Sequence, residues 1–315
     1  MSVDLQKRPP AAPSDCVAAI PVSADERLAP SRLRDLMTLI KVRIIVMAQV
    51  AVAAGAYVAG PGLIDWAGLA ATLVGISLVA AASFILNQLL ERESDARMAR
   101  TASRPLPAGR IGVREVLVLG IAAAALGLAT LALFVNAAAA FVAALTFSSY
   151  VFVYTPLKRH TTLNTLVGAI PGALPPVIGW VSVTGALDLG ALALFAILFL
   201  WQFPHFFAIA WIYREQYRDA GLAMLPVLDE SGDRTSRHIV GTALMLLPVS
   251  LLPTLIGLTG TAYLLGAAVL GLVYAGFAMA FALSRTNQQA RALFRVSLVY
   301  LPCLFILLSL DLTRV

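Results

Sequence analysis

Long apolar segments recur along almost the whole chain, and they restrict its fold more than any other feature. Each is roughly 20 residues long, which is the length that a helix needs to cross the hydrocarbon core of a bilayer. Of the 315 residues, 60% are hydrophobic and 13% are charged, and a water-soluble domain could not cover so apolar a chain with polar surface. The sequence therefore predicts an all-α, polytopic membrane protein with about nine transmembrane helices in a bundle. The expected helices are 36–58, 66–88, 113–134, 137–154, 163–183, 188–212, 236–257, 261–283 and 291–312.

The connections between these segments alternate in charge. All but one of the 23 Lys and Arg residues lie in the N-terminal segment or around the connections after the second, fourth, sixth and eighth helices. Positive charge collects on the cytosolic face of a membrane protein. The pattern predicts a cytosolic N-terminus and an external C-terminus, in a bacterial plasma membrane. The net charge of +6 then reports orientation, and it does not indicate a nucleic-acid partner.

The polar segments suggest where the chemistry lies. Residues 1–30 are rich in Pro, Ala, Ser and Asp and are expected to form a disordered cytosolic tail, which leaves 31–315 as one transmembrane domain. The longest connections, 89–112 and 213–235, are both on the predicted cytosolic face. Long loops held by a rigid scaffold commonly carry function, so we expect the active site to open on the cytosolic side.

Three oxygen-bearing side chains follow one another at intervals of four at the end of the second helix. Asn87, Glu91 and Asp95 would drift slowly around one helix face and span on the order of 12 Å. Carboxylate and amide oxygens, together with substrate phosphates, are the usual ligands of Mg²⁺. Alternatively, Glu91, Glu93 and Asp95 pair with the neighbouring Arg92, Arg97 and Arg100 on a solvated helix end. Asn87 favours the metal interpretation, because an unpartnered amide in an apolar segment is costly.

Seven stretches of the sequence are informative: Asn87–Asp95, Arg100–Arg110, Tyr154–Arg159, Gly172–Trp180, Trp201–Ala210, Tyr213–Tyr217 and Ala220–Pro226. Together these motifs resemble the UbiA superfamily of intramembrane prenyltransferases, and in particular its haem-farnesylating branch. The resemblance covers roughly residues 36–310. Two departures stand out: Gln216 replaces an acidic residue in the second acidic motif, and Val42 replaces a proline between Lys41 and Arg43.

The resemblance implies a Mg²⁺-dependent enzyme that transfers a farnesyl group from farnesyl diphosphate to a vinyl group of haem b. Water addition then gives haem O, and haem A synthase or terminal oxidase assembly factors become possible partners beside the lipid bilayer. The implied catalytic residues are Asn87, Glu91, Asp95 and Lys158, with Glu215 and Asp219 as further metal ligands. The implied diphosphate ligands are Arg100, Arg104, Lys158, Arg159, Lys41 and Arg43, and the implied haem contacts are His205 and Trp201.

Several of these residues also have ordinary structural explanations. Lys158 and Arg159 could be positive-inside anchors, and His205 could be a hydrogen-bonded residue of the helical core. Prolines and glycines at 171–179 are expected to break the fifth helix. Such a break makes room for a flat ring, serves close helix packing through small residues, or does both.

Three other functions are compatible with parts of the sequence. A related prenyltransferase acting on a quinone precursor or chlorophyllide would share the first acidic motif, but not the Trp-x-x-Pro-His-Phe segment. A secondary transporter would fit the broken helices and basic loops, although transporters place ionisable residues near the membrane midplane. A haem-binding assembly protein would need His205 but neither Glu91 nor Asp95.

Overall fold

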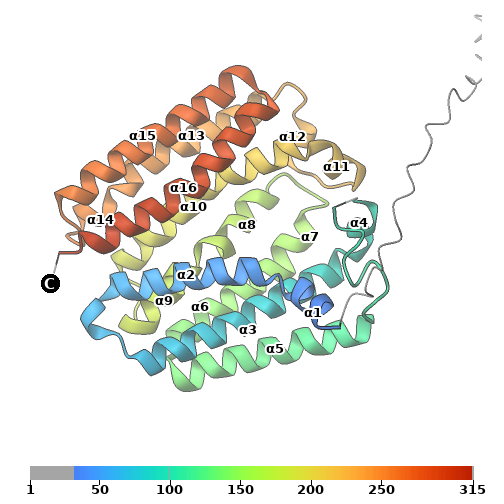
Figure 1. Ribbon diagram of the computed structural model, residues 1–315, viewed down its shortest axis with the longest axis horizontal. Helices are drawn as coiled ribbons and strands as arrows, with labels where there is room; N and C mark the ends of the chain where they lie inside the picture. Colours follow the sequence, from blue (N-terminus) through green and yellow to red (C-terminus); the bar gives the residue numbers. More distant parts are fainter. Residues whose placement is uncertain (1–31, 99, 314–315) are drawn as a thin grey trace, which may run out of the picture.

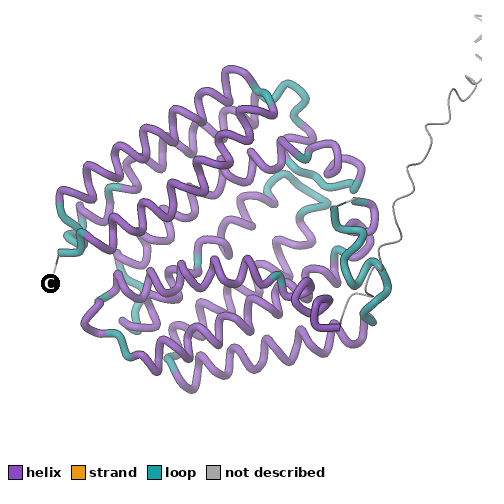
Figure 2. Tube along the Cα trace, viewed as in Figure 1, coloured by secondary structure: helices purple, strands orange, loops and turns teal. Residues whose placement is uncertain are grey.

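Long helices dominate the computed structural model, which describes residues 32–98 and 100–313 (Figure 1). Within this part of the chain nine helical segments are long and apolar enough to cross a membrane, and Figure 2 shows helices joined by loops and no strand. The prediction of an all-α, nine-helix membrane bundle is confirmed. The predicted disordered tail, residues 1–30, lies outside the described residues. The nine segments are α2 (Val42–Ala59), α3 (Trp66–Leu90), α5 (Val113–Phe134), α6–α7 (Ala137–Leu157), α8–α9 (Asn164–Thr184), α10 (Leu189–Ile212), α13–α14 (Asp233–Leu255), α15 (Thr261–Ser284) and α16 (Asn287–Leu310).

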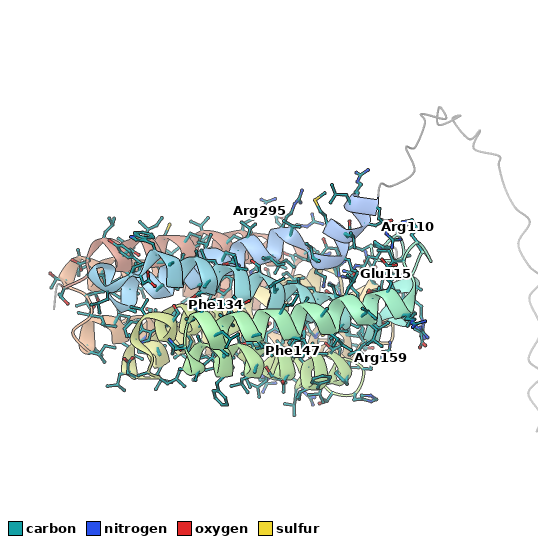
Figure 3. All side chains as sticks on the ribbon, turned by 90° about the horizontal axis from the view of Figure 1, so that it is seen from below. Arg110, Glu115, Phe134, Phe147, Arg159 and Arg295 are labelled. Carbon is teal, nitrogen blue, oxygen red and sulfur yellow. The ribbon has the colours of Figure 1, made fainter. Side chains whose placement is uncertain are left out.

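Four short helices gather at one end of the bundle. These are α1 (Arg32–Ile40), α4 (Arg92–Arg97), α11 (Arg214–Asp219) and α12 (Leu225–Leu228), and they lie together at the right of Figure 1. Figure 3 shows Arg110, Glu115 and Arg159 at this end, whereas Phe134 lies farther toward the other. The two long loops predicted to share one face, 89–112 (described except for residue 99) and 213–235, therefore lie at the same end. Together with the short helices they form what we call the polar cap over the ends of the membrane helices.

Side-chain caps define where helices start at the opposite end. Asp65 accepts hydrogen bonds from the backbone of Ala67 and Gly68, and Asp188 accepts them from Gly190 and Ala191. An acidic N-cap satisfies amides that have no partner within the helix and complements the positive end of the helix dipole. These caps fix the starts of α3 and α10, both of which run toward the polar cap.

The first predicted helix, 36–58, is wrong as a single element. Lys41 adopts left-handed backbone angles (φ 54°, ψ 54°), which cost a side-chain-bearing residue about 1–2 kcal/mol. The segment therefore divides into α1 and α2. The Arg110 guanidinium pairs with Asp35 through bonds of 2.9–3.1 Å and lowers the pKa of that carboxyl, and Gln88 donates to the Leu39 carbonyl. These contacts fasten α1 to the polar cap.

The predicted break in the fifth helix is confirmed, and it serves close packing. α8 (Asn164–Ala173) ends before Leu174, and α9 begins at Pro175. A Cβ at Gly179 would overlap the Val52 carbonyl oxygen of α2, and a Cβ at Gly172 would overlap the side-chain oxygen of Gln202 on α10. Neighbouring helices therefore fill the space at these two glycines, and room for a flat ring elsewhere along the break stays a prediction.

Candidate active site

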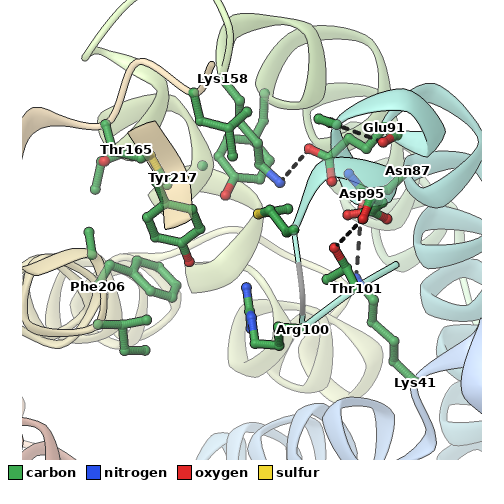
Figure 4. A pocket seen from close by; sticks show the side chains of 18 of the residues that line it. Lys41, Asn87, Glu91, Asp95, Arg100, Thr101, Lys158, Thr165, Phe206 and Tyr217 are labelled. Atoms are coloured by element: carbon green, nitrogen blue, oxygen red, sulfur yellow. Dashed lines mark hydrogen bonds and ion pairs between the residues drawn. The ribbon is translucent and has the colours of Figure 1, made fainter. Parts of the chain in front are cut away.

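A cavity of about 330 Å³ opens beneath the polar cap (Figure 4). Glu91 and Asp95 form one side of it, and Tyr217 and Phe206 lie across from them in Figure 4. Both charged side chains and apolar side chains line it, which suits a ligand with a charged head and a hydrocarbon tail. The lining residues are Lys41, Ile44, Asn87, Glu91, Ser94, Asp95, Met98, Arg100, Thr101, Arg104, Tyr154, Lys158, Thr165, Gly168, Phe206, Ile209, Ala210, Tyr217, Leu222 and Met224.

The acidic side of the cavity comes from the junction of α3 and α4. Asn87 lies in the last turn of α3, Glu91 is the hinge residue (φ −97°, ψ 5°), and Asp95 lies in α4. Backbone bonds continue from Glu91 N to Asn87 O (3.0 Å) and from Asp95 N to Glu91 O (2.8 Å). Although the helix changes direction at Glu91, the spacing of four therefore still brings all three side chains to the same cavity, as predicted.

Each carboxylate on this side faces a cation. Lys158 Nζ lies 2.7 Å from Glu91 Oε1, and Arg104 Nη1 donates to Asp95 Oδ2 at 2.6 Å. The Asp95 side chain is 2% exposed and that of Lys158 is 13% exposed. A buried charge is tolerable only when it is paired, so these contacts make the charges compatible with the cavity. The two ion pairs place two negative and two positive side chains in the wall of the same cavity.

Lys158 is held by two further groups besides Glu91. Its Nζ lies 4.5 Å from the centre of the Tyr154 ring, and its carbonyl accepts a hydrogen bond of 2.8 Å from Ala223 N. Burial alone would lower the pKa of Lys158, but Tyr154 and Glu91 outweigh this effect and the pKa is raised. The ammonium group is therefore charged and fixed in position, and its carbonyl joins it to the opposite loop.

A local change of helix type places Tyr154 and Lys158. Residues Ser149–Tyr154 form a π-helical segment between α6 (Ala137–Ser148) and α7 (Thr155–Leu157). The Thr155 hydroxyl donates to Tyr150 O at 2.8 Å and accepts from Asn87 Nδ2 at 3.1 Å. Thr155 therefore connects Asn87, on the acidic side of the cavity, to the segment that carries Tyr154 and Lys158. π-helical turns often occur at functional sites. A Cβ at Gly168 would overlap the Tyr154 ring, so the ring depends on glycine at that position.

Lys41 is a third cation that lines the cavity, beside Lys158 and Arg104. Its Nζ lies 3.5 Å from Asn87 Oδ1 and 5.1 Å from the centre of the Phe84 ring. Burial, with repulsion from Arg104 and Lys158, lowers the pKa of Lys41 to about 7. Its charge is therefore sensitive to the presence of an anion in the cavity, because an anion would hold the proton on the amine.

We expect diphosphate binding to weaken as the pH rises through 7 and above. The protonated form of Lys41 binds an anion better, and above pH 7 the free protein loses that proton, so the apparent affinity falls with the protonated fraction. Calorimetry with inorganic diphosphate in EDTA between pH 6 and 9 measures this effect. Lys41→Arg keeps its charge throughout the range and should give a shallower profile. Identical profiles for the two proteins would contradict the assignment.

Four of the six predicted diphosphate ligands line the cavity, and Lys41 is one of them. Arg104 and Lys158 reach it as described, and Arg100 lines it with its guanidinium 5.3 Å from the Tyr213 ring centre. Arg159 instead reaches Ser94 Oγ at 3.4 Å from an exposed position outside the lining. Arg43 lies on a second, apolar pocket between α1 and α2. Arg43 and Arg159 thus each lie next to residues that line the cavity, but they do not line it themselves.

The second acidic motif lies differently from the expectation. Glu215 and Asp219 are both exposed on α11 and do not line the cavity, whereas Tyr217 between them is buried and does. Residues two apart on a helix point about 200° away from each other. With Tyr217 facing inward, the two acids therefore face outward.

The expected haem contacts lie on a different face of α10 from the cavity. Trp201 Nε1 donates to Ser297 O on α16 at 2.9 Å, and the His205 ring stacks on Trp201 with centres 4.9 Å apart. Neither residue lines the cavity, but the next residue, Phe206, does. The two faces are therefore directly adjacent.

Sequence reasoning missed the aromatic part of the cavity. Tyr154 precedes Lys158 by four residues and thus shares its face, which is a signal that could have found it. Phe206 directly follows His205, which was predicted as a haem contact, and Tyr217 lies between Glu215 and Asp219, which were predicted as metal ligands. No periodicity singles them out, since aromatic residues at such positions usually pack in the core.

The donor set fits a hard divalent cation. Asn87, Glu91 and Asp95 contribute amide and carboxylate oxygens on one side of the cavity, and these are the atoms that Mg²⁺ prefers. Among the described residues, no three His, Cys, Asp or Glu side chains form a metal-binding group. An ion held here would therefore complete its shell with water or substrate phosphates, which is usual for Mg²⁺.

The membrane helices form a bundle, and a cavity lined by paired carboxylates and cations lies beneath its polar cap. This architecture suits an enzyme that transfers a group from a diphosphate within the membrane. The chain matches the UbiA prenyltransferase family over residues 48–306, and it belongs to that family. It is 48% identical to the protoheme IX farnesyltransferase of Solibacter usitatus, over 79% of this chain and 85% of that protein. It is 42% identical to the enzyme of the same name from Koribacter versatilis, over 90% and 94%.

Solved structures share the fold at low sequence identity. A digeranylgeranylglyceryl phosphate synthase gives a TM-score of 0.76 at 18% identity, covering 89% of this chain and 98% of that one. A UbiA homologue from Archaeoglobus fulgidus, bound to GPP and Mg²⁺, gives 0.56 at 20% identity, covering 87% and 99%. At such identities the likeness concerns the fold alone.

Proposed function

We propose that this protein transfers the farnesyl group of farnesyl diphosphate to a vinyl group of haem b, with addition of water, to give haem O. The observation that carries the proposal is the pair of carboxylate–cation contacts, Glu91–Lys158 and Asp95–Arg104, within a single cavity of a bundle of membrane helices. The names of the relatives, aligned along most of the chain, support the choice of donor and acceptor.

The polar side of the cavity is assigned to the diphosphate. Arg100, Arg104 and Lys158 carry the charge that would bind its oxygens and stabilise the charge that grows on it as the allylic carbon–oxygen bond breaks. The same anion would hold the proton on the Lys41 amine and so keep it charged. Asn87, Glu91 and Asp95 would hold Mg²⁺, which when bound supplies further stabilisation of the leaving group.

The apolar side is assigned to the farnesyl chain. Ile44, Ile209 and Phe206 line it with few polar atoms, and such a wall keeps water from a reactive allylic carbon. The rings of Tyr154 and Tyr217 also line the cavity, and an aromatic face attracts a neighbouring cation. They would therefore stabilise positive charge on the chain as the diphosphate leaves.

The remaining assignments rest on the same interpretation. His205 and Trp201 are assigned to the haem, Arg43 and Arg159 to the approach of the anion, and Glu215 and Asp219 to a metal only if α11 turns on substrate binding. The polar cap, which carries many of the Lys and Arg residues, would face the cytosol of a bacterial cell, with the C-terminus outside. Haem A synthase or terminal oxidase assembly factors would receive the product.

A product assay tests the proposed function. The purified full-length protein in nanodiscs is incubated with haem b, farnesyl diphosphate and Mg²⁺, and haem O is identified by mass. We expect the product to disappear in EDTA and in Asp95→Asn, which keeps the size of the side chain but removes its charge. Glu93→Gln is a matched control, because Glu93 is exposed on the same short helix and does not line the cavity. If wild type forms no haem O, or converts only a quinone precursor, the proposal fails.

A further inference from the structure

His205 makes a hydrogen bond that fixes the position of its protons. It lies in the membrane-spanning part of α10, and its Nδ1 is 2.7 Å from Ser297 Oγ on α16. The same Ser297 Oγ is 2.6 Å from the carbonyl oxygen of Phe294. A carbonyl has no hydrogen to give, so the serine hydroxyl must donate to it.

The serine hydroxyl has one hydrogen, and the Phe294 carbonyl takes it. The contact with His205 is therefore a hydrogen bond in which Nδ1–H donates to the serine oxygen. In a neutral imidazole only one nitrogen carries a hydrogen, so Nε2 is left with a free lone pair. A metal-binding histidine is held in this way, with its second nitrogen donating to an oxygen that fixes the tautomer.

The surroundings hold the ring and leave this lone pair unused. Trp201 stacks on one side with centres 4.9 Å apart, and the Phe294 ring centre is 5.1 Å away. The side chain is only partly buried, and Nε2 has no hydrogen-bond partner in the described part of the chain. A polar atom without a partner at membrane depth is costly and indicates a functional site.

We infer that Nε2 of His205 is an axial ligand of the iron of the haem substrate. This inference rests on the proposed function and adds the atom through which the protein takes hold of its acceptor. Imidazole is a common axial ligand of haem iron. The Phe206 ring, 5.5 Å from that of His205, lines the cavity opposite Glu91 and Asp95 (Figure 4). A haem held at His205 therefore lies beside the cavity that holds the farnesyl chain.

A cation is available for the carboxylates of the haem. Arg291 stands three residues before Phe294 on α16, so the two share a helix side, with about 4.5 Å between them along the axis. It is exposed, and no described residue forms an ion pair with it. α16 starts at the capped end of the bundle, where Asn287 accepts from Arg214. A propionate paired with Arg291 would point toward the polar cap, and the rest of the ring would lie deeper.

Haemin titration of the purified full-length protein tests the ligation. We expect wild type to give the absorption and EPR spectra of imidazole-ligated iron, and His205→Ala to lose them. His205→Gly with added imidazole should regain them. The other two histidines, His160 and His238, lie outside the cavity and outside this cluster, so their alanine variants are matched controls. Binding of inorganic diphosphate reports whether each variant is folded.

Ser297 acts through His205 and is a positioning residue. Ser297→Ala should weaken haemin binding about tenfold by releasing the tautomer, whereas Ser297→Thr keeps the hydroxyl and should restore the wild-type spectrum. Unchanged spectra in folded His205→Ala, or no haemin binding by wild type, would overturn the inference. Haem O formation is measured separately: if wild type shows the imidazole-ligated spectra but forms no haem O, the proposed function fails and the ligation stands.

Discussion

Replacement of Lys158 by glutamine is expected to lower the rate of haem O formation by about 10²–10³-fold. Lys158 lines the cavity, pairs with Glu91 at 2.7 Å and lies over the Tyr154 ring. Removing one fixed group that stabilises a leaving anion typically costs a factor of this size. Glutamine keeps most of the side-chain length, so the loss would concern the charge. Steady-state rates at saturating farnesyl diphosphate give the comparison.

The adjacent residue offers a matched control for this experiment. Arg159 has the same charge and lies in the same loop, but it is exposed and does not line the cavity, and its guanidinium contacts only the hydroxyl of the lining residue Ser94 at 3.4 Å. Arg159→Gln should therefore reduce the rate by no more than about threefold, since it removes only a distant, screened charge. Equal losses in the two variants would mean that both act by general attraction, and that Lys158 has no special place at the leaving group.

Gly179→Ala is expected to destabilise the folded protein by at least about 2 kcal/mol. The added Cβ would overlap the carbonyl oxygen of Val52, and backbone atoms cannot rotate out of the way as a side chain can. The helices α2 and α9 would have to separate, which disturbs the buried interface around Val52 and Ile178. Thermal unfolding in detergent, followed by the loss of monodisperse protein, measures the effect.

Gly276 provides the comparison within another membrane helix. A Cβ at this position in α15 meets no atom within 4 Å, so Gly276→Ala should leave stability unchanged or raise it by about 0.5–1 kcal/mol through helix propensity. If both variants unfold at the same temperature as the wild type, the close approach of α2 and α9 is not required for the fold.

The fold could be predicted from the sequence because a bilayer imposes helix length and polarity directly. The expected helix 113–134 coincides with α5, and most other ends differ by a few residues. The error at the first helix has a physical cause. Lys41 takes a left-handed conformation that only the contacts of α1, such as Asp35 with Arg110, can stabilise. No local pattern in the sequence records these distant contacts.

The site could be predicted only in part, for a similar reason. Asn87, Glu91 and Asp95 reach the cavity because a spacing of four is a helix property that survives the bend at Glu91. The second acidic motif has no such internal rule. Which side of α11 faces inward is decided by the burial of Tyr217 among Met98, Ala220 and Leu222, and this choice turns Glu215 and Asp219 outward.

The π-helical segment Ser149–Tyr154 has a consequence for changes in chain length. A π turn holds one residue more than the α turn that it replaces. Losing one residue here would restore an ordinary α-helix without rotating the residues after it, whereas the same deletion within α5 would rotate all later residues of that helix by about 100°. The chain can thus shorten by one residue within Ser149–Tyr154 and still direct Lys158 into the cavity, although the Thr155–Tyr150 bond would be lost.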